Sequence, residues 1–263
     1  MPTYPIEGIM NIVSRLRRLA QNLSTTGLPL LALAVVAPSA FAGPLLTPII
    51  LNGSFEDVGT ASASFSINNT TILPSWTAAP TGNKILNCLV YAGATNNLCG
   101  NAFGGGLQFW VNPGASPDGG NYVAIDGDPN FAVPLSETVT GLIAGEKYSI
   151  SFYQPATQQM GFDGATTERW RVTLGASPAQ LTTLMSNANH GAVGWMRQTL
   201  IFTAANASEL LTFVAVGTPQ GLPPFVLLDG VSIAVAVPEP ATFALIGFGL
   251  LALPALRRFR KKQ

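Results

Sequence analysis

The feature that most limits what this chain can fold into is its hydrophobic pattern between Gly43 and Ala236. No stretch there keeps the 3.6-residue period of an amphipathic helix. Short apolar or alternating runs recur instead, separated by glycine, proline, asparagine and aspartate. This pattern predicts an all-β body of about nine or ten strands, arranged as a single jelly-roll or β-sandwich domain over residues 43–236.

The clearest strands form a hairpin over Ser136–Leu142 and Lys147–Tyr153. In the second strand Tyr148, Ile150 and Phe152 alternate with polar residues, so they share one face. Further strands are expected at Ile49–Leu51, Phe65–Ile67, Thr71–Leu73, Ile85–Tyr91, Leu107–Val111, Asn121–Asp126, Trp170–Leu174, Leu200–Thr203, Leu210–Val216, Phe225–Asp229 and Val231–Val235.

The C-terminal residues 237–263 fall into three parts: Val237-Pro238-Glu239-Pro240, an uncharged apolar run Ala241–Leu256, and a basic end. A bilayer core of about 30 Å asks for roughly 20 helical residues, so the run is a short but workable membrane span. Basic residues beside a span stay on the cytoplasmic side, which places the body outside. The basic residues are Arg257, Arg258, Arg260, Lys261 and Lys262.

In this order the three parts resemble the PEP-CTERM sorting signal of exported proteins in Gram-negative bacteria that make extracellular polysaccharide. The resemblance implies an exosortase as partner, a membrane-embedded cysteine peptidase that cleaves near the proline-flanked glutamate. It implies an inner-membrane intermediate with a cytoplasmic C-terminus, followed by delivery to the cell surface or the extracellular matrix. The alternatives are a simple tail anchor and a buried helix, although a buried helix would not need five basic residues.

Residues 1–42 have the features of a secretory signal peptide, which implies export through the Sec translocon. A basic segment precedes the apolar stretch Leu28–Ala37, and small residues follow it. Met10 is an alternative start, because the first segment is long. A membrane span is the other interpretation, which the short apolar run and the Ala-x-Ala sequence disfavour. The cleavage site is expected at Ala40, Ala42 and Gly43.

The formal net charge of zero hides an acidic body. Both ends are basic, whereas residues 43–236 hold five bases against eleven acids and carry a net charge of −6. Nucleic acid binding rests on basic contacts to phosphate, so this composition argues against it. Sugars or a divalent cation are ligands compatible with an acidic body.

Cys88 and Cys99 are the only cysteines, and export to an oxidising compartment favours a disulfide between them over two free thiols.

A second resemblance rests on the order of four motifs along the body. They are Leu51-Asn52-Gly53-Ser54-Phe55-Glu56, then Trp76, then the hairpin segment at Gly141–Phe152, and finally Leu227-Leu228-Asp229-Gly230-Val231. This order is similar to the galactose-binding-like jelly rolls, which include many carbohydrate-binding modules. Since that fold hosts many functions, it implies a fold more than a ligand.

No cofactor is expected to be required. The same resemblance implies that Glu56 and Asp229 could hold a structural calcium ion. Calcium takes six to eight oxygen ligands, which carboxylates and carbonyls supply. The alternative is that both acids accept backbone hydrogen bonds at strand ends. Asp126-Gly127-Asp128 resembles the start of a calcium loop, but no ligand series follows, so a turn is expected there.

Three aromatic residues are candidates for a sugar-stacking surface: Trp110, Tyr122 and Trp76. Trp110 and Tyr122 flank a loop rich in glycine, proline and asparagine, whereas Trp170 alternates with core residues. The alternative is that these rings pack inside the sandwich, as most aromatic side chains do.

Catalysis has little support in the sequence, and no enzyme is expected. His190 is the only histidine and lies in a loop, where it is expected to be solvated. Asp163 and Glu168 are close enough in sequence to form a carboxylate pair, as in glycoside hydrolysis. They lie in a turn rich in glycine and threonine, however, and acids in a turn of this kind are usually solvated.

Three functional hypotheses follow. The first is an exported surface or biofilm-matrix protein whose sandwich binds polysaccharide. The second is a purely structural matrix protein without a defined ligand, and the third is an exported hydrolase.

Overall fold

The computed structural model describes residues 48–59, 71–78, 87–90, 98–99 and 107–236, and every regular element in these ranges is a β-strand. The chain divides into two compact units, residues 1–45 and 46–263, and all the strands belong to the second. No helix long and apolar enough to cross a membrane occurs within the described ranges.

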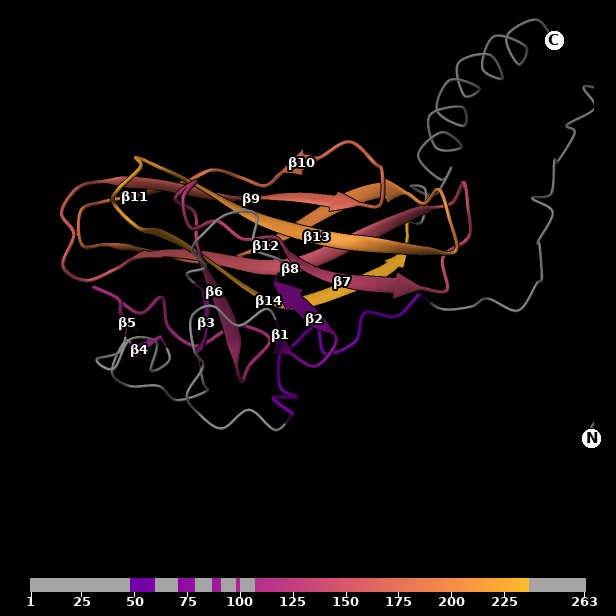
Figure 1. Ribbon diagram of the computed structural model, residues 1–263, viewed down its shortest axis with the longest axis horizontal. Helices are drawn as coiled ribbons and strands as arrows, with labels where there is room; N and C mark the ends of the chain where they lie inside the picture. The colour runs from indigo at the N-terminus through magenta and orange to yellow at the C-terminus, as the bar shows by residue number, and fades with distance from the viewer. Residues whose placement is uncertain (1–47, 60–70, 79–86, 91–97, 100–106, 237–263) are drawn as a thin grey trace, which may run out of the picture. The chain divides into compact units, whose positions relative to one another are not determined.

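The strands form two antiparallel sheets that pack face to face, so the predicted all-β jelly-roll sandwich is confirmed (Figure 1). Sheet A contains, in spatial order, β1 (Thr71–Leu73), β2 (Trp76–Ala78), β7 (Leu135–Thr140), β13 (Ser208–Thr218), β9 (Thr166–Leu174) and β10 (Gln180–Leu181), with β11 (Met185–Asn187) also paired to β9. Sheet B contains β12 (Ala192–Thr203), β8 (Lys147–Gln158), β14 (Pro224–Val235), β6 (Tyr122–Asp126) and β3 (Asn87–Val90). A separate pair joins β4 (Leu98–Cys99) to β5 (Leu107–Gln108).

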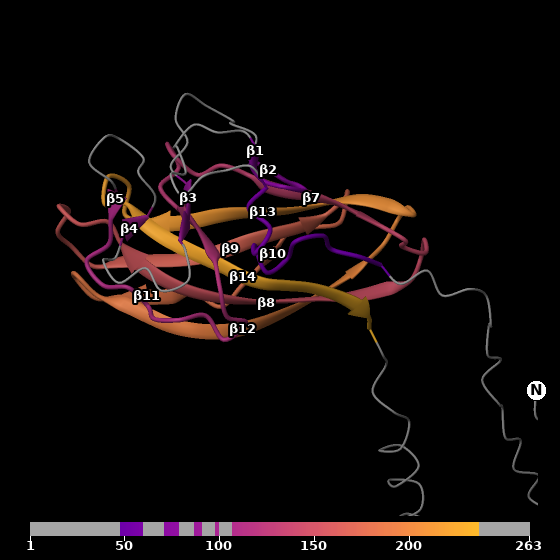
Figure 2. The ribbon, with the colours of Figure 1, turned by 90° about the horizontal axis from the view of Figure 1, so that it is seen from below.

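The longer strands alternate between the sheets in chain order. Strands β6, β8, β12 and β14 lie in sheet B, whereas β7, β9 and β13 lie in sheet A. The connections between these strands therefore cross from one sheet to the other, as in a jelly roll, and collect at the two ends of the sandwich. Residues far apart in the sequence meet in the loops at each end (Figure 2).

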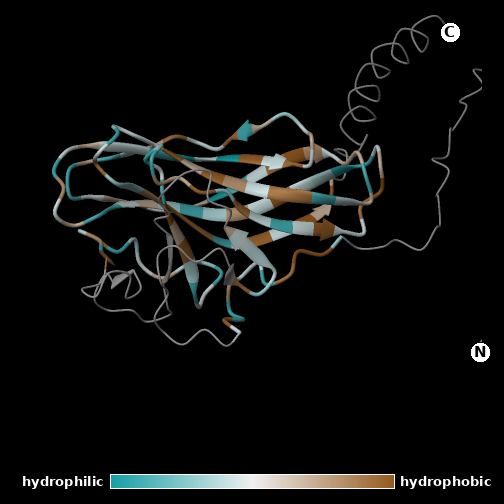
Figure 3. Ribbon diagram, viewed as in Figure 1, coloured by the Kyte–Doolittle hydropathy of each residue, from teal (hydrophilic) through white to brown (hydrophobic). Residues whose placement is uncertain are grey.

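Aromatic rings dominate the main core between the sheets. Trp76, Phe152, Trp170 and Phe213 are all fully buried, and the other three rings each lie 5.0–6.2 Å from the ring of Phe213. Edge-on and tilted ring pairs at such distances add to the stabilisation from burial itself. Figure 3 shows hydrophobic and hydrophilic residues alternating along the long strands, which is the pattern that buries one face of each sheet.

A second, smaller hydrophobic cluster covers the outer face of sheet B. In β14, Val226 and Leu228 belong to the main core, whereas Phe225 and Leu227 point the other way into this cluster. The remaining buried members are Leu107, Phe109, Tyr122 and Ala124, with Phe131 and Trp195 packed against them. The segment that begins at Leu107 therefore lies over sheet B, which makes both faces of that sheet buried along β6 and the first half of β14.

The long edge strand β12 pairs only with β8, yet side chains from the segment around β10 reach its other edge. The Ser177 hydroxyl donates to the Thr203 carbonyl at 3.2 Å, and Gln180 Nε2 donates to the Ile201 carbonyl at 2.6 Å. These bonds satisfy backbone acceptors that an edge strand otherwise leaves open.

Several of the expected strands differ from the observed ones. The segment Ile49–Leu51 is not a strand: Ile49 makes a single bridge to Thr140, and a turn begins at Leu51. The two strands expected at the end of the body are one strand, β14, with an irregularity between Asp229 and Ser232. The strand expected at Phe65–Ile67 lies outside the described residues.

Candidate functional site

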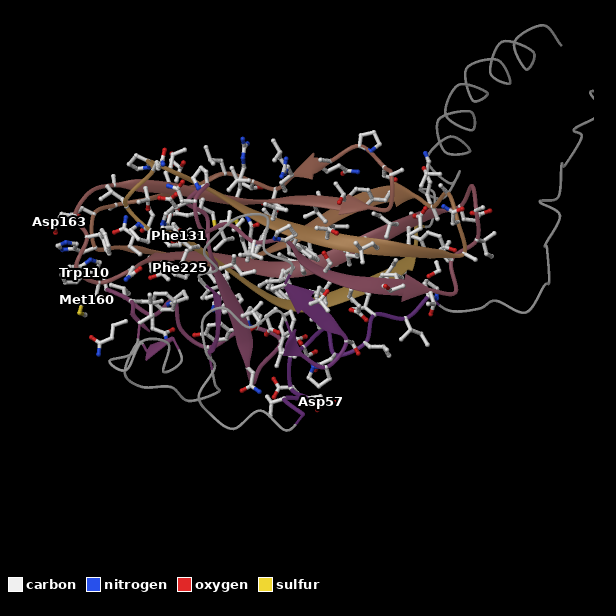
Figure 4. All side chains as sticks on the ribbon, viewed as in Figure 1. Asp57, Trp110, Phe131, Met160, Asp163 and Phe225 are labelled. Carbon is white, nitrogen blue, oxygen red and sulfur yellow. The ribbon has the colours of Figure 1, made fainter. Side chains whose placement is uncertain are left out.

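One end of the sandwich brings together the segment after β5, the β8–β9 loop and the β11–β12 loop. Trp110 N–H donates to the Gln158 carbonyl at 3.0 Å, and Met160 N–H donates to the Gln108 carbonyl at 2.7 Å. The sheet therefore fixes the position of Trp110, since these bonds continue the pairing along β8. Figure 4 shows Trp110, Met160 and Asp163 at this end; with Phe162 and His190 they are termed the distal tip.

The centre of the distal tip is a stack of two rings. The ring centroids of Trp110 and His190 lie 3.8 Å apart with an interplanar angle of 27°. Trp110 Nε1 donates to the Phe162 carbonyl at 2.9 Å, and His190 Nε2 lies 2.5 Å from Asp163 Oδ1. The Asp163 side chain is 79% exposed, and a polar contact this exposed contributes at most about 1 kcal/mol to stability. Its effect is to orient the imidazole.

The backbone at His190 is held in a conformation that is unusual for its residue type. Its φ is +58°, in the left-handed region that non-glycine residues seldom adopt. Its N–H donates to Gln158 Oε1 at 2.7 Å, and the neighbouring Asn189 Oδ1 accepts from Gly164 N–H at 2.6 Å. These two bonds tie the β11–β12 loop to β8 and to the β8–β9 loop, so the strained position is maintained by contacts on both sides.

A buried polar network lies directly beneath the distal tip. Gln158 Nε2 donates to Thr166 Oγ1 at 2.8 Å, and the Thr166 hydroxyl donates to Glu168 Oε1. Glu168 is fully buried, and loss of hydration raises its pKa to about 8, an effect that the hydrogen bonds from Thr166 and Asn187 oppose. At neutral pH the protonated carboxyl therefore predominates.

The catalytic pair considered from the sequence is not assembled. Asp163 is exposed and binds His190, whereas Glu168 lies in the interior below Gln158 and Thr166. Glycoside hydrolysis needs two carboxyl groups that flank one substrate bond, and these two do not share a surface.

The exposed surface of the distal tip combines apolar side chains with oriented polar groups. Met160 and Phe162 are 39% and 38% exposed, and Val111 beside Trp110 is 42% exposed. The imidazole of His190 and the carboxylate of Asp163 add hydrogen-bonding atoms at fixed positions. An apolar surface with a few well-placed polar groups is typical of sites that recognise small molecules or sugar rings.

Trp76 is not part of any stacking surface, and the expectation that it would be is wrong. It is fully buried in the main core, and its Nε1 donates to the Leu51 and Asn52 carbonyls, each at 3.1 Å. The indole therefore fastens the turn after Ile49–Leu51 onto sheet A. Its ring packs against Phe55 and Phe213 and has no exposed face for a sugar.

Tyr122 is likewise a packing residue. It is 4% exposed in the second cluster, its ring lies edge-on to Trp195 at 5.1 Å, and its hydroxyl donates to Asn112 Oδ1 at 3.1 Å. Burial raises the pKa of this hydroxyl. Of the three predicted stacking residues, only Trp110 lies at the surface.

Glu56 and Asp229, the predicted calcium ligands, lie in one acidic cluster with Asp118. The charges of Asp118 and Glu56 both act to raise the pKa of Asp229, although burial is the larger cause and brings that pKa to about 7. Glu56 Oε1 accepts the Asn121 N–H at 2.6 Å, so one of its oxygens is already committed.

The carboxylate of Asp229 is the feature of this cluster that fits a cation. Asp229 is fully buried and neither oxygen has a partner of good hydrogen-bond geometry, although the Ser116 hydroxyl and the Gly230 N–H lie close enough to lower its pKa. Within the described ranges, however, no three side chains of histidine, cysteine, aspartate or glutamate are arranged to hold a metal by themselves. A calcium ion here would need carbonyl, hydroxyl or water oxygens as well.

Asp126-Gly127-Asp128 forms the expected turn. Asp126 Oδ1 accepts the Asp128 N–H, and the two oxygens of Asp128 accept the N–H groups of Asn130 and Gly221. Backbone donors thus bind both oxygens of Asp128 and Oδ1 of Asp126, whereas Asp126 Oδ2 is buried without a partner among the described residues.

Several predicted sites lie outside the described residues: the signal peptide with its cleavage site, and the C-terminal motif, apolar run and basic end. Cys88 lies in β3 and Cys99 in β4, but the structure describes only their backbone, so the disulfide stays a prediction.

Sequence reasoning missed that Trp110, Asp163 and His190 meet. They come from three loops separated by about 50 and 27 residues, and only the pairing of β8 with its neighbours brings them together. The signal available in the sequence was that each lies in or beside a segment that contains glycine and is expected to be a loop.

Comparison with known proteins identifies the C-terminal segment. Residues 236–261 match the PEP-CTERM protein-sorting motif, so the chain carries the sorting signal of exported proteins. No curated protein matches the chain.

Among solved structures, TmCBM61 in complex with β-1,4-galactotriose is similar at 16% identity, covering 71% of this chain and 97% of that one, with a TM-score of 0.42. A second similar structure, described as "CBM4 structure and function", has 16% identity, covers 72% of this chain and 100% of the other, and has a TM-score of 0.34. The K3 cleaved adhesin domain of Lys-gingipain from Porphyromonas gingivalis has 14% identity, 60% and 94% coverage, and a TM-score of 0.34. Likeness at these scores does not transfer a ligand or an activity to this chain.

Proposed function

We propose that this chain is an exported, non-enzymatic surface or matrix protein whose sandwich binds polysaccharide at the distal tip. The observation that carries the proposal is the Trp110–His190 stack, held at a partly exposed end of the sandwich with Asp163 on the imidazole. The sorting motif supports the location, because it directs proteins to the space where extracellular polysaccharide is found.

The chemistry of the distal tip suits a sugar ring. A pyranose has apolar C–H faces and polar edges, so it needs apolar side chains beside fixed hydrogen-bonding groups. Trp110, Met160 and Phe162 supply the first, and His190 with Asp163 supplies the second. Because β8 fixes Trp110 and Gln158 fixes His190, the site is organised before a ligand arrives, which lowers the entropy cost of binding.

Binding of purified exported protein to a panel of neutral and acidic polysaccharides tests this function. We expect Trp110→Ala to weaken binding of the best neutral polymer at least about tenfold, as loss of a central aromatic contact does. Ile201→Ala, which trims a 52% exposed side chain on β12, is the matched control and should bind normally. If Trp110→Ala binds normally with the fold intact, the distal tip is not the site; if the wild type binds no polymer, the purely structural role is favoured.

The processing route is part of the same proposal. Export through the Sec translocon would be followed by an inner-membrane intermediate and cleavage by an exosortase near Pro238-Glu239-Pro240. Replacing Pro238 and Glu239 together with alanine should leave full-length protein in the inner membrane. Unchanged cleavage and delivery would refute the role of the motif.

We also propose a structural calcium ion at Asp229, with Glu56 and Asp118 contributing charge. The unpartnered, buried carboxylate of Asp229 supports it. Chelation of calcium should lower the melting temperature of the wild type and leave that of Asp229→Asn unchanged. If chelation changes the melting temperatures of the two proteins equally, Asp229 does not hold a calcium ion.

A further inference from the structure

A groove lies on the outer face of sheet A, away from the distal tip. It has a volume of about 340 Å³ and runs between the loop that carries Pro129 and Pro134 and the outward residues Val214 and Val216 of β13. Among the described residues that line it, only Arg171 of β9 is charged. Volumes of about 300–1,000 Å³ with apolar walls and few polar groups are typical of small-ligand pockets.

A second arginine, Arg169, lies next to Arg171 on the same outward face of β9. Arg169 and Arg171 occupy successive outward positions of β9, where they pair across the sheet with Val216 and Val214. Neither guanidinium makes an ion pair or a side-chain hydrogen bond with another described residue. The Nε of Arg169 is buried without an acceptor, and a buried donor without a partner is costly.

The charge of this face contrasts with the rest of the body. Residues 43–236 carry a net charge of −6 and only five bases, two of which are this pair. Guanidinium groups bind carboxylates through two parallel N–H···O bonds, and such charge-assisted bonds are stronger than neutral ones. An anion with a carboxylate-like fork of acceptors therefore suits this face.

We propose that the groove beside Arg171 binds a uronic acid unit of an acidic polysaccharide, as a second site on a protein whose distal tip binds polysaccharide. This inference rests on the proposed function and adds the substrate class. The carboxylate meets the guanidinium of Arg171, with Arg169 beside it, and the C–H face of the ring packs on Val214, Val216 and the two prolines.

The strand order of sheet A disfavours an acidic peptide as occupant. β13 lies between β7 and β9 and pairs with both, so its backbone groups are already bonded and no free edge is available for strand addition. A peptide buried in the groove would lose hydration at its amide groups without gaining replacement bonds. A sugar ring avoids this cost because its hydroxyl groups can stay in water at the open side.

Isothermal titration of the purified exported protein with polygalacturonate tests the site, with a neutral galactan and poly-L-glutamate as comparison polymers. Arg171→Gln should weaken polygalacturonate binding at least about tenfold, and Arg171→Lys, which keeps the charge but loses the fork, should be intermediate. Arg169→Gln should weaken it several-fold. Arg197→Gln removes one exposed charge from the outer face of sheet B and should leave affinity within about twofold.

Each alternative gives a distinct result. Equal losses in Arg171→Gln and Arg197→Gln would show non-specific attraction and overturn the site, as would an absence of polygalacturonate binding in the wild type. Arg171-dependent binding of poly-L-glutamate at the same affinity would assign the groove to acidic peptides instead. Trp110→Ala should retain polygalacturonate binding, so failure of the distal tip and failure of the groove remain distinguishable.

Discussion

The space between the two sheets has an apolar half and a polar half, and the change occurs within two strands. Along β8 the inward residue Phe152 is followed by inward Gln154 and Gln158; along β9 inward Trp170 is preceded by inward Glu168 and Thr166. All of these side chains are buried. The apolar half packs aromatic rings, whereas the polar half joins hydrogen bonds beneath the distal tip.

The two halves contribute differently to folding. Burying a large aromatic side chain releases hydrophobic free energy without any demand on geometry beyond good packing. Buried polar groups stabilise only when each finds a partner, and among the described residues three atoms here have none of good hydrogen-bond geometry: Gln154 Oε1, Glu168 Oε2 and Asn187 Nδ2. The apolar half therefore stabilises the sandwich, and the polar half fixes the loops that form the distal tip, at some cost in stability.

The largest expected effect comes from breaking the apolar half. Phe213→Ala removes the ring that contacts Trp76, Phe152 and Trp170, so it should lower the free energy of unfolding by about 3–5 kcal/mol. Phe162→Ala, at the exposed distal tip, should change it by less than about 0.5 kcal/mol. Chemical denaturation of both variants measures the difference, and similar losses would mean that the two regions do not differ as described.

A smaller effect is expected from the polar half, and it depends on pH. Burial raises the pKa of Glu168 from 4.5 to about 8, so the unfolded state loses its proton first as pH rises. The folded state then binds more protons, and stability falls between about pH 4.5 and 8, by an amount on the order of a few kcal/mol from this residue. Asp126, Glu137 and Asp229, whose pKa values are also raised by burial, should add to the slope.

Glu168→Gln separates this contribution from the others. The amide keeps the shape of the side chain but cannot ionise, so denaturation curves across this pH range should show a flatter decline than the wild type. Glu146→Gln alters an exposed residue and is the matched control. A decline as steep in Glu168→Gln as in the wild type would show that the buried network does not govern the pH response.

The smallest expected effect is on the surface of the distal tip. Asp163→Asn weakens the contact that orients His190, so it should reduce polysaccharide affinity a few-fold while changing the free energy of unfolding by less than about 1 kcal/mol. Binding isotherms and denaturation of the same preparation measure both quantities. A loss of stability above this value would mean that the ion pair supports the fold rather than the site.

The sequence pattern predicts the strands well in the apolar half, but the predicted strands do not extend into the polar half. The return strand of the hairpin was expected to end at Tyr153, but β8 continues to Gln158; the strand expected at Trp170–Leu174 begins at Thr166. Alternation of apolar residues is the signal that reveals a half-buried strand. Where the inward residues are Gln154, Gln158 and Glu168, the signal disappears although the strand continues.

The same limit explains the site predictions. Trp110 was identified from its loop, but Trp76 and Tyr122 were assigned to the surface because the sequence does not show which way a ring next to a loop points. Glu56 and Asp229 were expected together and do lie in one cluster, since their motifs open and close the domain. The Asp163–His190 contact depends on two loops meeting, which no local pattern records.

The side chains along β12 have a consequence for the protein at high concentration. The unpaired N–H and C=O groups of a 12-residue edge strand normally allow a strand of a second molecule to pair with it, which begins an ordered aggregate. Ser177 and Gln180 occupy carbonyls along that edge, so a neighbouring chain finds fewer acceptors there. If the protein has the matrix role proposed above, molecules that bind one shared polymer would lie close together and still remain separate particles rather than form fibrils.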